Sequence, residues 1–188
     1  LVTGAGGSIG SGLCEQILKL KPKRLILLEI SEPSLYNLHQ ELMQKNNNQI
    51  EIIPMLGNCC NQIFVDKFFA KYNVNSIFHT AAYKHVPLVE SNPLSGIANN
   101  VFSTKVVCSA AIKNNVEKVT FISTDKAVRP TNVMGASKRV AELIVQCFAE
   151  ENFLQNSQNK KNTIFSMVRF GNVLGSSGSV VPLFQKQI

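Results

Sequence analysis

The chain has 188 residues, of which 45% are hydrophobic and 16% are charged. That length suits one ordinary domain, and the composition excludes wholesale disorder because it supplies enough apolar surface for a core. The net charge of +7 permits an anionic partner, but the basic residues are scattered and form no nucleic-acid-binding motif, so we expect no nucleic acid to bind.

Apolar residues alternate along the chain between strand-like and helix-like spacing. The pattern predicts strands at Leu1–Thr3, Arg24–Ile30, Glu51–Leu56, Ser76–Thr80, Lys118–Thr124 and Thr163–Phe170. It predicts helices at Ser8–Leu20, Ser34–Lys45, Gln62–Tyr72, Ser95–Lys113 and from Val133 to about Asn152. Such alternation is typical of a parallel sheet, because a right-handed crossover between parallel strands needs a helix. We therefore predict an α/β fold with a doubly wound, Rossmann-like parallel sheet and no internal domain boundary.

The apolar runs and the cysteines limit where the chain can reside. No run approaches the ~18 residues of a membrane span, and no signal peptide precedes the first strand. The five cysteines are odd in number and include no C-x-x-C pair, so we expect reduced thiols in a cytosolic compartment and no metal site. Because the chain starts in mid-strand without methionine, we expect it to be a fragment.

A glycine-rich turn lies between the first predicted strand and the first helix. Gly4, Gly7 and Gly10 form a G-x-x-G-x-x-G pattern, which lets a pyrophosphate approach the backbone at a helix N-terminus. Glu29 follows 19 positions after Gly10, at the end of the second strand. A carboxylate there can accept hydrogen bonds from a ribose hydroxyl and would repel a 2′-phosphate. The pattern indicates a dinucleotide site that prefers NAD; the alternatives are a plain turn and a solvated glutamate.

Two short motifs follow at the fifth strand and the next helix. Thr124, Asp125 and Lys126 end the strand, where ligands of doubly wound sheets bind, and a neighbouring carboxyl and amine can divide acid and base roles. Met134 and Lys138 are one helical turn apart and share a face. The alternative for Asp125 and Lys126 is a solvated ion pair on a loop.

Together these motifs resemble the extended short-chain dehydrogenase/reductases, and within them the polysaccharide-biosynthesis nucleotide-sugar 4,6-dehydratases. Three blocks carry the resemblance, which covers essentially the whole chain: 81–90 (AAYKHVPLVE), 123–139 and 169–182 (RFGNVLGSSGSVVP). The resemblance implies a single NAD-binding catalytic domain over residues 1–188, without the part of the sugar-nucleotide pocket that follows in the family.

The resemblance implies roles position by position. Cofactor-binding positions are Gly4, Gly7, Ser8, Ile9, Gly10, Glu29, Asn58, Ala81, Ala82, Tyr83, Asn100 and Lys138. Substrate-facing positions are Lys84, His85, Asn172, Ser176, Ser177 and Val180, the last three in a glycine- and serine-rich loop. Two positions depart from the family: Asn58 stands where aspartate is frequent, and Ser103 stands where glycine is usual.

Met134 departs from the wider group of short-chain dehydrogenases and is the most informative difference. Most of them have a tyrosine at this position that accepts a proton, and a thioether cannot accept that proton. The catalytic group implied by the resemblance is Thr124, Asp125, Lys126, Met134 and Lys138. Lys126 would take the C5 proton of the sugar, Asp125 would protonate the departing C6 hydroxyl, and Thr124 would hydrogen-bond the C4 oxygen. Lys138 would hold the nicotinamide ribose.

The expected activity is NAD-dependent loss of water from a UDP-N-acetylhexosamine, with UDP-N-acetylglucosamine as the first candidate, for surface polysaccharide or glycan synthesis. A nucleotide-sugar epimerase and a non-catalytic NAD-binding module are the alternatives. The resemblance also implies a homo-oligomer, placed in the cytoplasm, whose full-length form is attached to the cytoplasmic face of the inner membrane.

Overall fold

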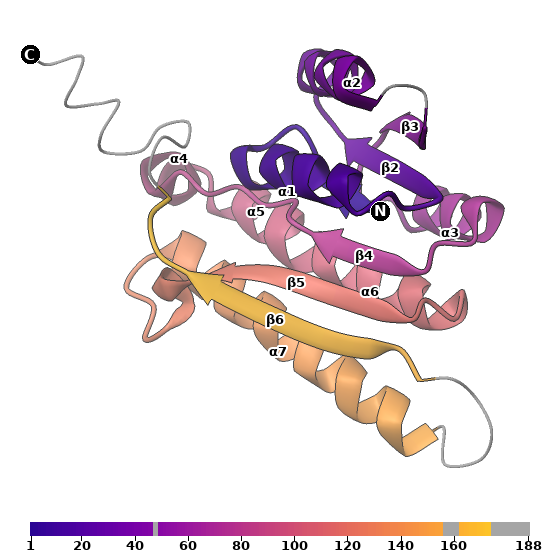
Figure 1. Ribbon diagram of the computed structural model, residues 1–188. Helices are drawn as coiled ribbons and strands as arrows, with labels where there is room; N and C mark the ends of the chain where they lie inside the picture. Colours follow the sequence, from indigo (N-terminus) through magenta and orange to yellow (C-terminus); the bar gives the residue numbers. More distant parts are fainter. Residues whose placement is uncertain (47–48, 156–161, 174–188) are drawn as a thin grey trace, which may run out of the picture.

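The computed structural model describes residues 1–46, 49–155 and 162–173. Within them, six parallel strands form one sheet in the order β3-β2-β1-β4-β5-β6 (Figure 1). The strands are β1 (Val2–Thr3), β2 (Arg24–Glu29), β3 (Glu51–Leu56), β4 (Ser76–His79), β5 (Lys118–Thr124) and β6 (Ile164–Phe170). The order reverses beside β1, and such a reversal opens a crevice at the carboxyl ends of the strands. The predicted α/β class and doubly wound parallel sheet are confirmed.

Helices connect the strands and cover the sheet. The α-helices are α1 (Ser8–Lys19), α2 (Glu32–Asn46), α3 (Gln62–Tyr72), α4 (Val86–Ser91), α5 (Pro93–Ile97), α6 (Ser103–Lys113) and α7 (Val133–Gln155). A π-helical turn, η1 (Ala98–Phe102), joins α5 to α6, and a short 3-10 turn, η2 (Asp125–Ala127), follows β5. The ends of α3 show why the sequence stops and starts there: the Asn61 side chain accepts the Phe64 amide, and Asn73 adopts a left-handed conformation.

The core lies on both faces of the sheet. Helices α1 and α2 pack on one face of β1 and β2 through residues such as Cys14, Leu38 and Leu42. Helices α3 and α6 cover the other face through Phe69 and Val107, and α7 continues that layer over β5 and β6 (Figure 1). Five of the six residues of β2 are buried, as its continuous apolar run predicts. Pro54 sits in β3, where an edge strand tolerates a missing amide donor.

One predicted element is wrong in its extent. The sequence predicts a single helix over Ser95–Lys113, whereas the structure divides this region into α5, η1 and α6, and adds α4 before them. Asn92 interrupts the chain between α4 and α5 with a non-helical backbone, and Pro93 begins α5. The π-turn then inserts extra backbone between α5 and α6, a local feature that is frequent at functional sites.

None of the helices in residues 1–46, 49–155 and 162–173 combines the length and the apolar character that a membrane span requires.

Candidate functional site

A cavity of about 640 Å³ opens at the carboxyl ends of the strands. Most of the predicted site residues line it: Gly4, Gly7, Ser8, Ile9, Gly10, Ala82, Tyr83, Lys84, His85, Thr124, Lys126, Met134, Lys138 and Asn172. A smaller cavity of about 230 Å³ adjoins it and shares the glycine turn; Glu29, Asn58 and Ala81 line this second space. Three predicted substrate positions, Ser176, Ser177 and Val180, lie outside the described residues.

The glycine turn has a shape that only glycine fits. Gly4 has φ +63°, and a Cβ on Gly10 would stand 2.2 Å from the Gly4 carbonyl oxygen. The chain therefore turns tightly enough to bring the N-terminus of α1 to the cavity. Hydrogen bonding in α1 begins with Ser11 donating to Gly7, so the amides of Ile9 and Gly10 have no carbonyl partner within the helix. These amides and the helix dipole fit the pyrophosphate of a dinucleotide.

Glu29 ties the end of β2 to this turn. Its carboxylate accepts hydrogen bonds from the backbone amides of Gly6 at 2.9 Å, Ile30 at 2.9 Å and Ser31 at 3.0 Å. A carboxylate offers about four acceptor positions, so capacity is left for a ribose hydroxyl. The sequence predicted the ribose contact; it gave no sign that the same carboxylate also fixes the glycine turn.

The turn after β5 gathers the polar groups at the mouth of the cavity. Lys126 Nζ donates to Asp125 Oδ1 at 3.2 Å and to Asn172 Oδ1 at 3.0 Å, so it joins the ends of β5 and β6. Hydrogen bonds from the Thr124 hydroxyl and from Lys126 hold the pKa of Asp125 below its usual range. The Asp125 side chain is 57% exposed and does not line the larger cavity, although it contacts two residues that do.

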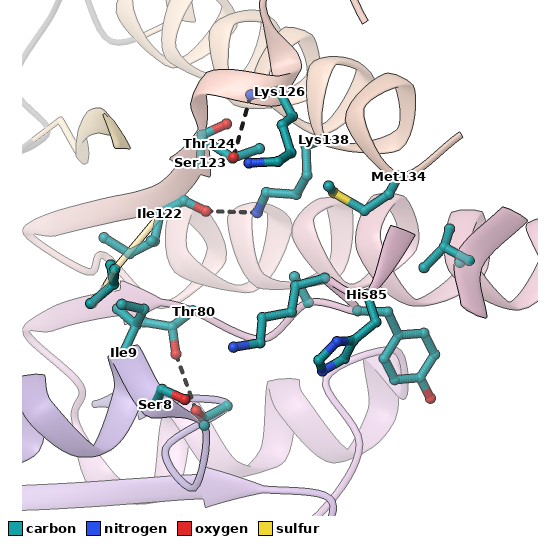
Figure 2. A pocket seen from close by; sticks show the side chains of 18 of the residues that line it. Ser8, Ile9, Thr80, His85, Ile122, Ser123, Thr124, Lys126, Met134 and Lys138 are labelled. Atoms are coloured by element: carbon teal, nitrogen blue, oxygen red, sulfur yellow. Dashed lines mark hydrogen bonds between the residues drawn. The ribbon is translucent and has the colours of Figure 1, made fainter. Parts of the chain in front are cut away.

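Helix α7 carries Met134 and Lys138 on its buried side. Lys138 Nζ donates to the Ile122 carbonyl at 2.6 Å and lies 4.0 Å from the centre of the Phe121 ring. Burial lowers the pKa of Lys138 to about 7, while the negative charge of Glu142 acts in the opposite direction. Figure 2 shows Lys126, Met134 and Lys138 on one side of the cavity and Ser8 and Ile9 on the other.

Close packing and capping place the first turn of α7 against the turn after β5. A Cβ on Gly135 would stand 2.3 Å from the Lys126 carbonyl oxygen, so glycine allows this approach. The Asn132 side chain accepts the Gly135 amide at 2.8 Å, and Glu90 at the end of α4 accepts the Val133 amide. Glu90 thus links the segment that carries Lys84 and His85 to the helix that carries Met134.

Asn100 has a different setting from the other predicted cofactor positions. It lines neither cavity, and its side chain is buried at 1% exposure in the π-turn. Its Oδ1 accepts the Tyr83 amide at 2.7 Å, and its Nδ2 donates to the Tyr83 carbonyl at 3.1 Å and to Ser137 Oγ at 2.9 Å. Asn100 therefore braces the Tyr83 backbone against α7, and its direct contact with a cofactor stays a prediction.

In the described part of the chain, no group of three or more His, Cys, Asp or Glu side chains is placed to hold a metal ion. The cysteines are free, and burial raises the pKa of Cys14, Cys59 and Cys108 to about 12. Inert thiols of this kind are packing residues.

Comparison with known proteins shows the family of the chain. A family model described as "Polysaccharide biosynthesis protein" matches residues 1–188. The capsular polysaccharide biosynthesis protein CapD of Staphylococcus aureus is 47% identical to this chain over all 188 residues. These residues correspond to 30% of the length of CapD. An uncharacterized membrane protein of Methanocaldococcus jannaschii is 41% identical, and a UDP-glucose 4-epimerase of Rickettsia rickettsii is 37% identical. The chain covers 53% and 52% of these two, so it spans a third to a half of its curated relatives.

Solved structures share the fold. Pen from Bacillus thuringiensis superposes with a TM-score of 0.87 at 37% identity, over all of this chain and 56% of that one. DesIV, a dTDP-glucose 4,6-dehydratase from Streptomyces venezuelae solved with NAD, gives a TM-score of 0.78 at 18% identity, over 99% of this chain and 60% of that one. At that identity the likeness shows the fold alone. The family match over the full length identifies the chain as a member of the polysaccharide biosynthesis protein family.

Proposed function

We propose that the chain is the NAD-dependent catalytic domain of a nucleotide-sugar 4,6-dehydratase, with a UDP-N-acetylhexosamine, first of all UDP-N-acetylglucosamine, as substrate. The observation that carries the proposal is the contact of Lys126 Nζ with both Asp125 and Asn172 at the mouth of the glycine-lined cavity. This contact brings a potential acid and a potential base together where a sugar would meet a nicotinamide. Met134 occupies the position of the usual tyrosine, so these two groups would do the acid–base work.

The cofactor would bind along the two adjoining cavities. The glycine turn fits its pyrophosphate, Glu29 and Asn58 line the space for its adenosine, and Lys138 lies where its nicotinamide ribose would reach. The glycine turn, Glu29 and Lys138 would hold NAD⁺, which would supply reversible hydride transfer, from C4 of the sugar and later to C6.

The residues of the chain would handle the protons. Lys126 removes the C5 proton, which the C4 ketone has made acidic, while Asp125 gives a proton to the C6 hydroxyl so that it leaves as water. The C5–H and C6–O bonds break, and a C5–C6 double bond forms. The Lys126 ammonium would then return a proton to C5 as hydride reaches C6, so the net change is the loss of one water.

In the structure Lys126 Nζ is a hydrogen-bond donor, so it must release a proton before it can act as a base. The Lys126 side chain is 35% exposed, so this proton would pass to solvent. Thr124 Oγ1 donates to Asp125 Oδ1 at 2.9 Å. The hydroxyl would turn from Asp125 to the C4 oxygen when substrate enters. We assign the C4 hydroxyl proton to Asp125 before the elimination step, and this proton converts Asp125 into the acid that the C6 hydroxyl needs.

An epimerase is the second candidate, because the Rickettsia rickettsii relative carries that name. Mass spectrometry of UDP-N-acetylglucosamine incubated with the full-length protein and NAD⁺ separates a dehydratase from the other two candidates. A dehydratase gives a product lighter by one water, an epimerase gives an isomer of equal mass, and a binding module returns the substrate unchanged. Either of the last two results would overturn the proposal.

We further propose that the full-length protein works as a homo-oligomer on the cytoplasmic face of the inner membrane. The name of the Methanocaldococcus jannaschii relative, a membrane protein, supports the membrane attachment. Cell fractionation followed by crosslinking tests both points: the proposal expects the protein in the membrane fraction and in crosslinked multiples.

A further inference from the structure

Glu142 is a fully buried carboxylate that the proposed chemistry does not use. It lies in α7 one turn after Lys138, with its side chain at 0% exposure. Its Oε1 accepts from Ser123 Oγ at 2.6 Å and from Arg169 Nε at 2.7 Å. Its Oε2 accepts from Arg169 at 2.6 Å and from Arg139 at 3.0 Å. Three elements, β5, β6 and α7, therefore meet at one carboxylate.

Each partner of Glu142 lies within three sequence positions of a residue that lines the larger cavity. Ser123 directly precedes Thr124, Arg139 directly follows Lys138, and Arg169 comes three residues before Asn172. Ser123 and Arg169 are also paired with each other in the register of β5 and β6. Glu142 thus bonds to both residues of the pair Ser123–Arg169, which is the second-to-last pair between β5 and β6.

The contact between Lys126 and Asn172 depends on this register. It joins the segments that leave β5 and β6, over 3.0 Å between Nζ and Oδ1. A small slide of one strand along the other would separate these two atoms. We infer that Glu142 is a positioning residue that sets the ends of β5 and β6 and the first turns of α7, and so places Lys126 and Asn172 for the sugar; the inference rests on the proposed dehydratase function.

The energetics favour a positioning role over a merely stabilising one. Burial alone would raise the pKa of Glu142, but hydrogen bonds from Arg169, Ser123 and Arg139 lower it to about 2, so it stays ionised. A buried ion pair contributes little net stability compared with apolar packing, yet it can fix one geometry. Ala141 and Val145, close to Glu142 along α7, belong to an apolar core cluster.

The test compares Glu142→Gln with wild type in the full-length protein with NAD⁺ and UDP-N-acetylglucosamine. The amide keeps the size but directs an N–H₂ group at an arginine, so the strand ends should shift. We expect kcat to fall about 10- to 100-fold, the scale of a ~1 Å misplacement. KM for the UDP-sugar should change less than about threefold, because a displaced Lys126 weakens the transition state more than the bound ground state.

A matched control is Asp66→Asn, which makes the same carboxylate-to-amide change in a surface ion pair. Asp66 accepts from Lys113 at 2.7 Å and from Gln62 at 2.8 Å, on α3 and away from the cavity. Its kcat and KM should stay at wild-type values. Equal kcat in Glu142→Gln and wild type would overturn the inference, and so would a rise in KM with unchanged kcat.

Amide hydrogen exchange of the same proteins reports directly on the backbone at the ends of β5 and β6. Exchange should rise in segments 123–126 and 169–172 of Glu142→Gln and stay unchanged in Asp66→Asn. If Glu142→Gln does not fold, Ser123→Ala removes one partner only and should raise exchange in 123–126 with a smaller loss of kcat. If wild type removes no water from UDP-N-acetylglucosamine, the proposed function alone is wrong. If amide exchange in both segments of Glu142→Gln equals that of wild type, the positioning role of Glu142 is wrong.

Discussion

Lys126 has a setting that separates its role from that of an ordinary surface lysine. It is partly buried at 35% side-chain exposure and joins two oxygen atoms from different strand ends. If it removes the C5 proton, Lys126→Met should lower turnover roughly 10²- to 10⁴-fold, the usual contribution of a general base. Product made by wild type in D₂O should carry deuterium at C5, and the variant should lose both product and exchange, as followed by mass spectrometry.

Lys105 on α6 provides the matched control for this substitution, because it is an exposed lysine away from both cavities. Lys105→Met should keep wild-type turnover. NAD binding should survive in Lys126→Met, since the glycine turn lies on the opposite side of the cavity (Figure 2). Near-normal turnover of Lys126→Met would remove Lys126 from the base role and make His85 the next candidate.

Lys138 should make stability depend on pH. Its pKa is about 7 in the folded chain because of burial and about 10.5 when unfolded, so between these values the unfolded state binds more protons. Stability must therefore rise as pH increases through this window. From pH 6.5 to 8.5 the free energy of unfolding should gain about 2 kcal/mol from this group.

Urea unfolding of wild type and Lys138→Met, followed by circular dichroism at both pH values, isolates the Lys138 contribution. The change in the free energy of unfolding between the two pH values should be about 2 kcal/mol smaller in the variant than in wild type, because the other buried titratable groups are common to both proteins. A difference between the two proteins that is the same at pH 6.5 and at pH 8.5 would contradict the low pKa of Lys138.

At the level of elements, the π-turn η1 depends on one side chain. Asn100 there makes hydrogen bonds to both backbone groups of Tyr83 and to Ser137. Asn100→Ala would remove the side-chain partner of the part-buried Tyr83 amide and carbonyl and one of the two partners of Ser137 Oγ, which also donates to the Met134 carbonyl. A buried group left unpaired costs about 1–3 kcal/mol. We expect a loss of about 3 kcal/mol in the free energy of unfolding, measured by urea denaturation.

Asn114→Ala is the control for Asn100→Ala. Asn114 follows α6 and donates one hydrogen bond, to the Ala110 carbonyl at 2.8 Å. Its removal should cost less than about 1 kcal/mol, because the carbonyl can turn to water. A loss of similar size in both variants would show that Asn100 does not brace the segment of Tyr83.

The elements whose hydrophobic period is regular were predictable from the sequence. β3, α3 and β5 have the predicted bounds, and strand–helix alternation predicted the parallel sheet, though not its strand order. The division of Ser95–Lys113 was not predictable, because a π-turn keeps the helical period almost unchanged. The contact of its Asn100 with Tyr83 also joins residues that are distant in sequence. Tertiary contacts decided that element, as they often override local preference.

The residues of the candidate site also fall into those that the sequence predicted and those that it did not. The glycine turn and the residues Thr124–Lys126 and Met134–Lys138 were predictable because each is a local motif at a strand end or helix start. Glu142 was missed, although a glutamate four residues after Lys138 on the buried face of α7 is a signal that could have been read. Glu90 gave no such signal, because it reaches α7 from a separate helix.

At the scale of the whole molecule, the cofactor cavities lie where the two halves of the sheet meet. The glycine turn follows β1, Glu29 ends β2, Tyr83 follows β4 and Thr124 ends β5. A dinucleotide bound there would contact elements on both sides of the reversal in strand order. Its binding free energy should therefore add to the stability of the entire domain and not to one loop.

Thermal unfolding with each nucleotide tests this coupling and the choice of cofactor together. NAD at a hundred times its dissociation constant should add about 2.7 kcal/mol, which raises Tm by roughly 5–10 °C in a chain of this size. NADP at the same concentration should give a smaller rise, because the Glu29 carboxylate would face the 2′-phosphate. Glu29→Gln removes that repulsion at nearly constant size and should bring the two values of Tm closer. A rise with NADP that equals or exceeds the rise with NAD in wild type would take Glu29 out of the ribose site.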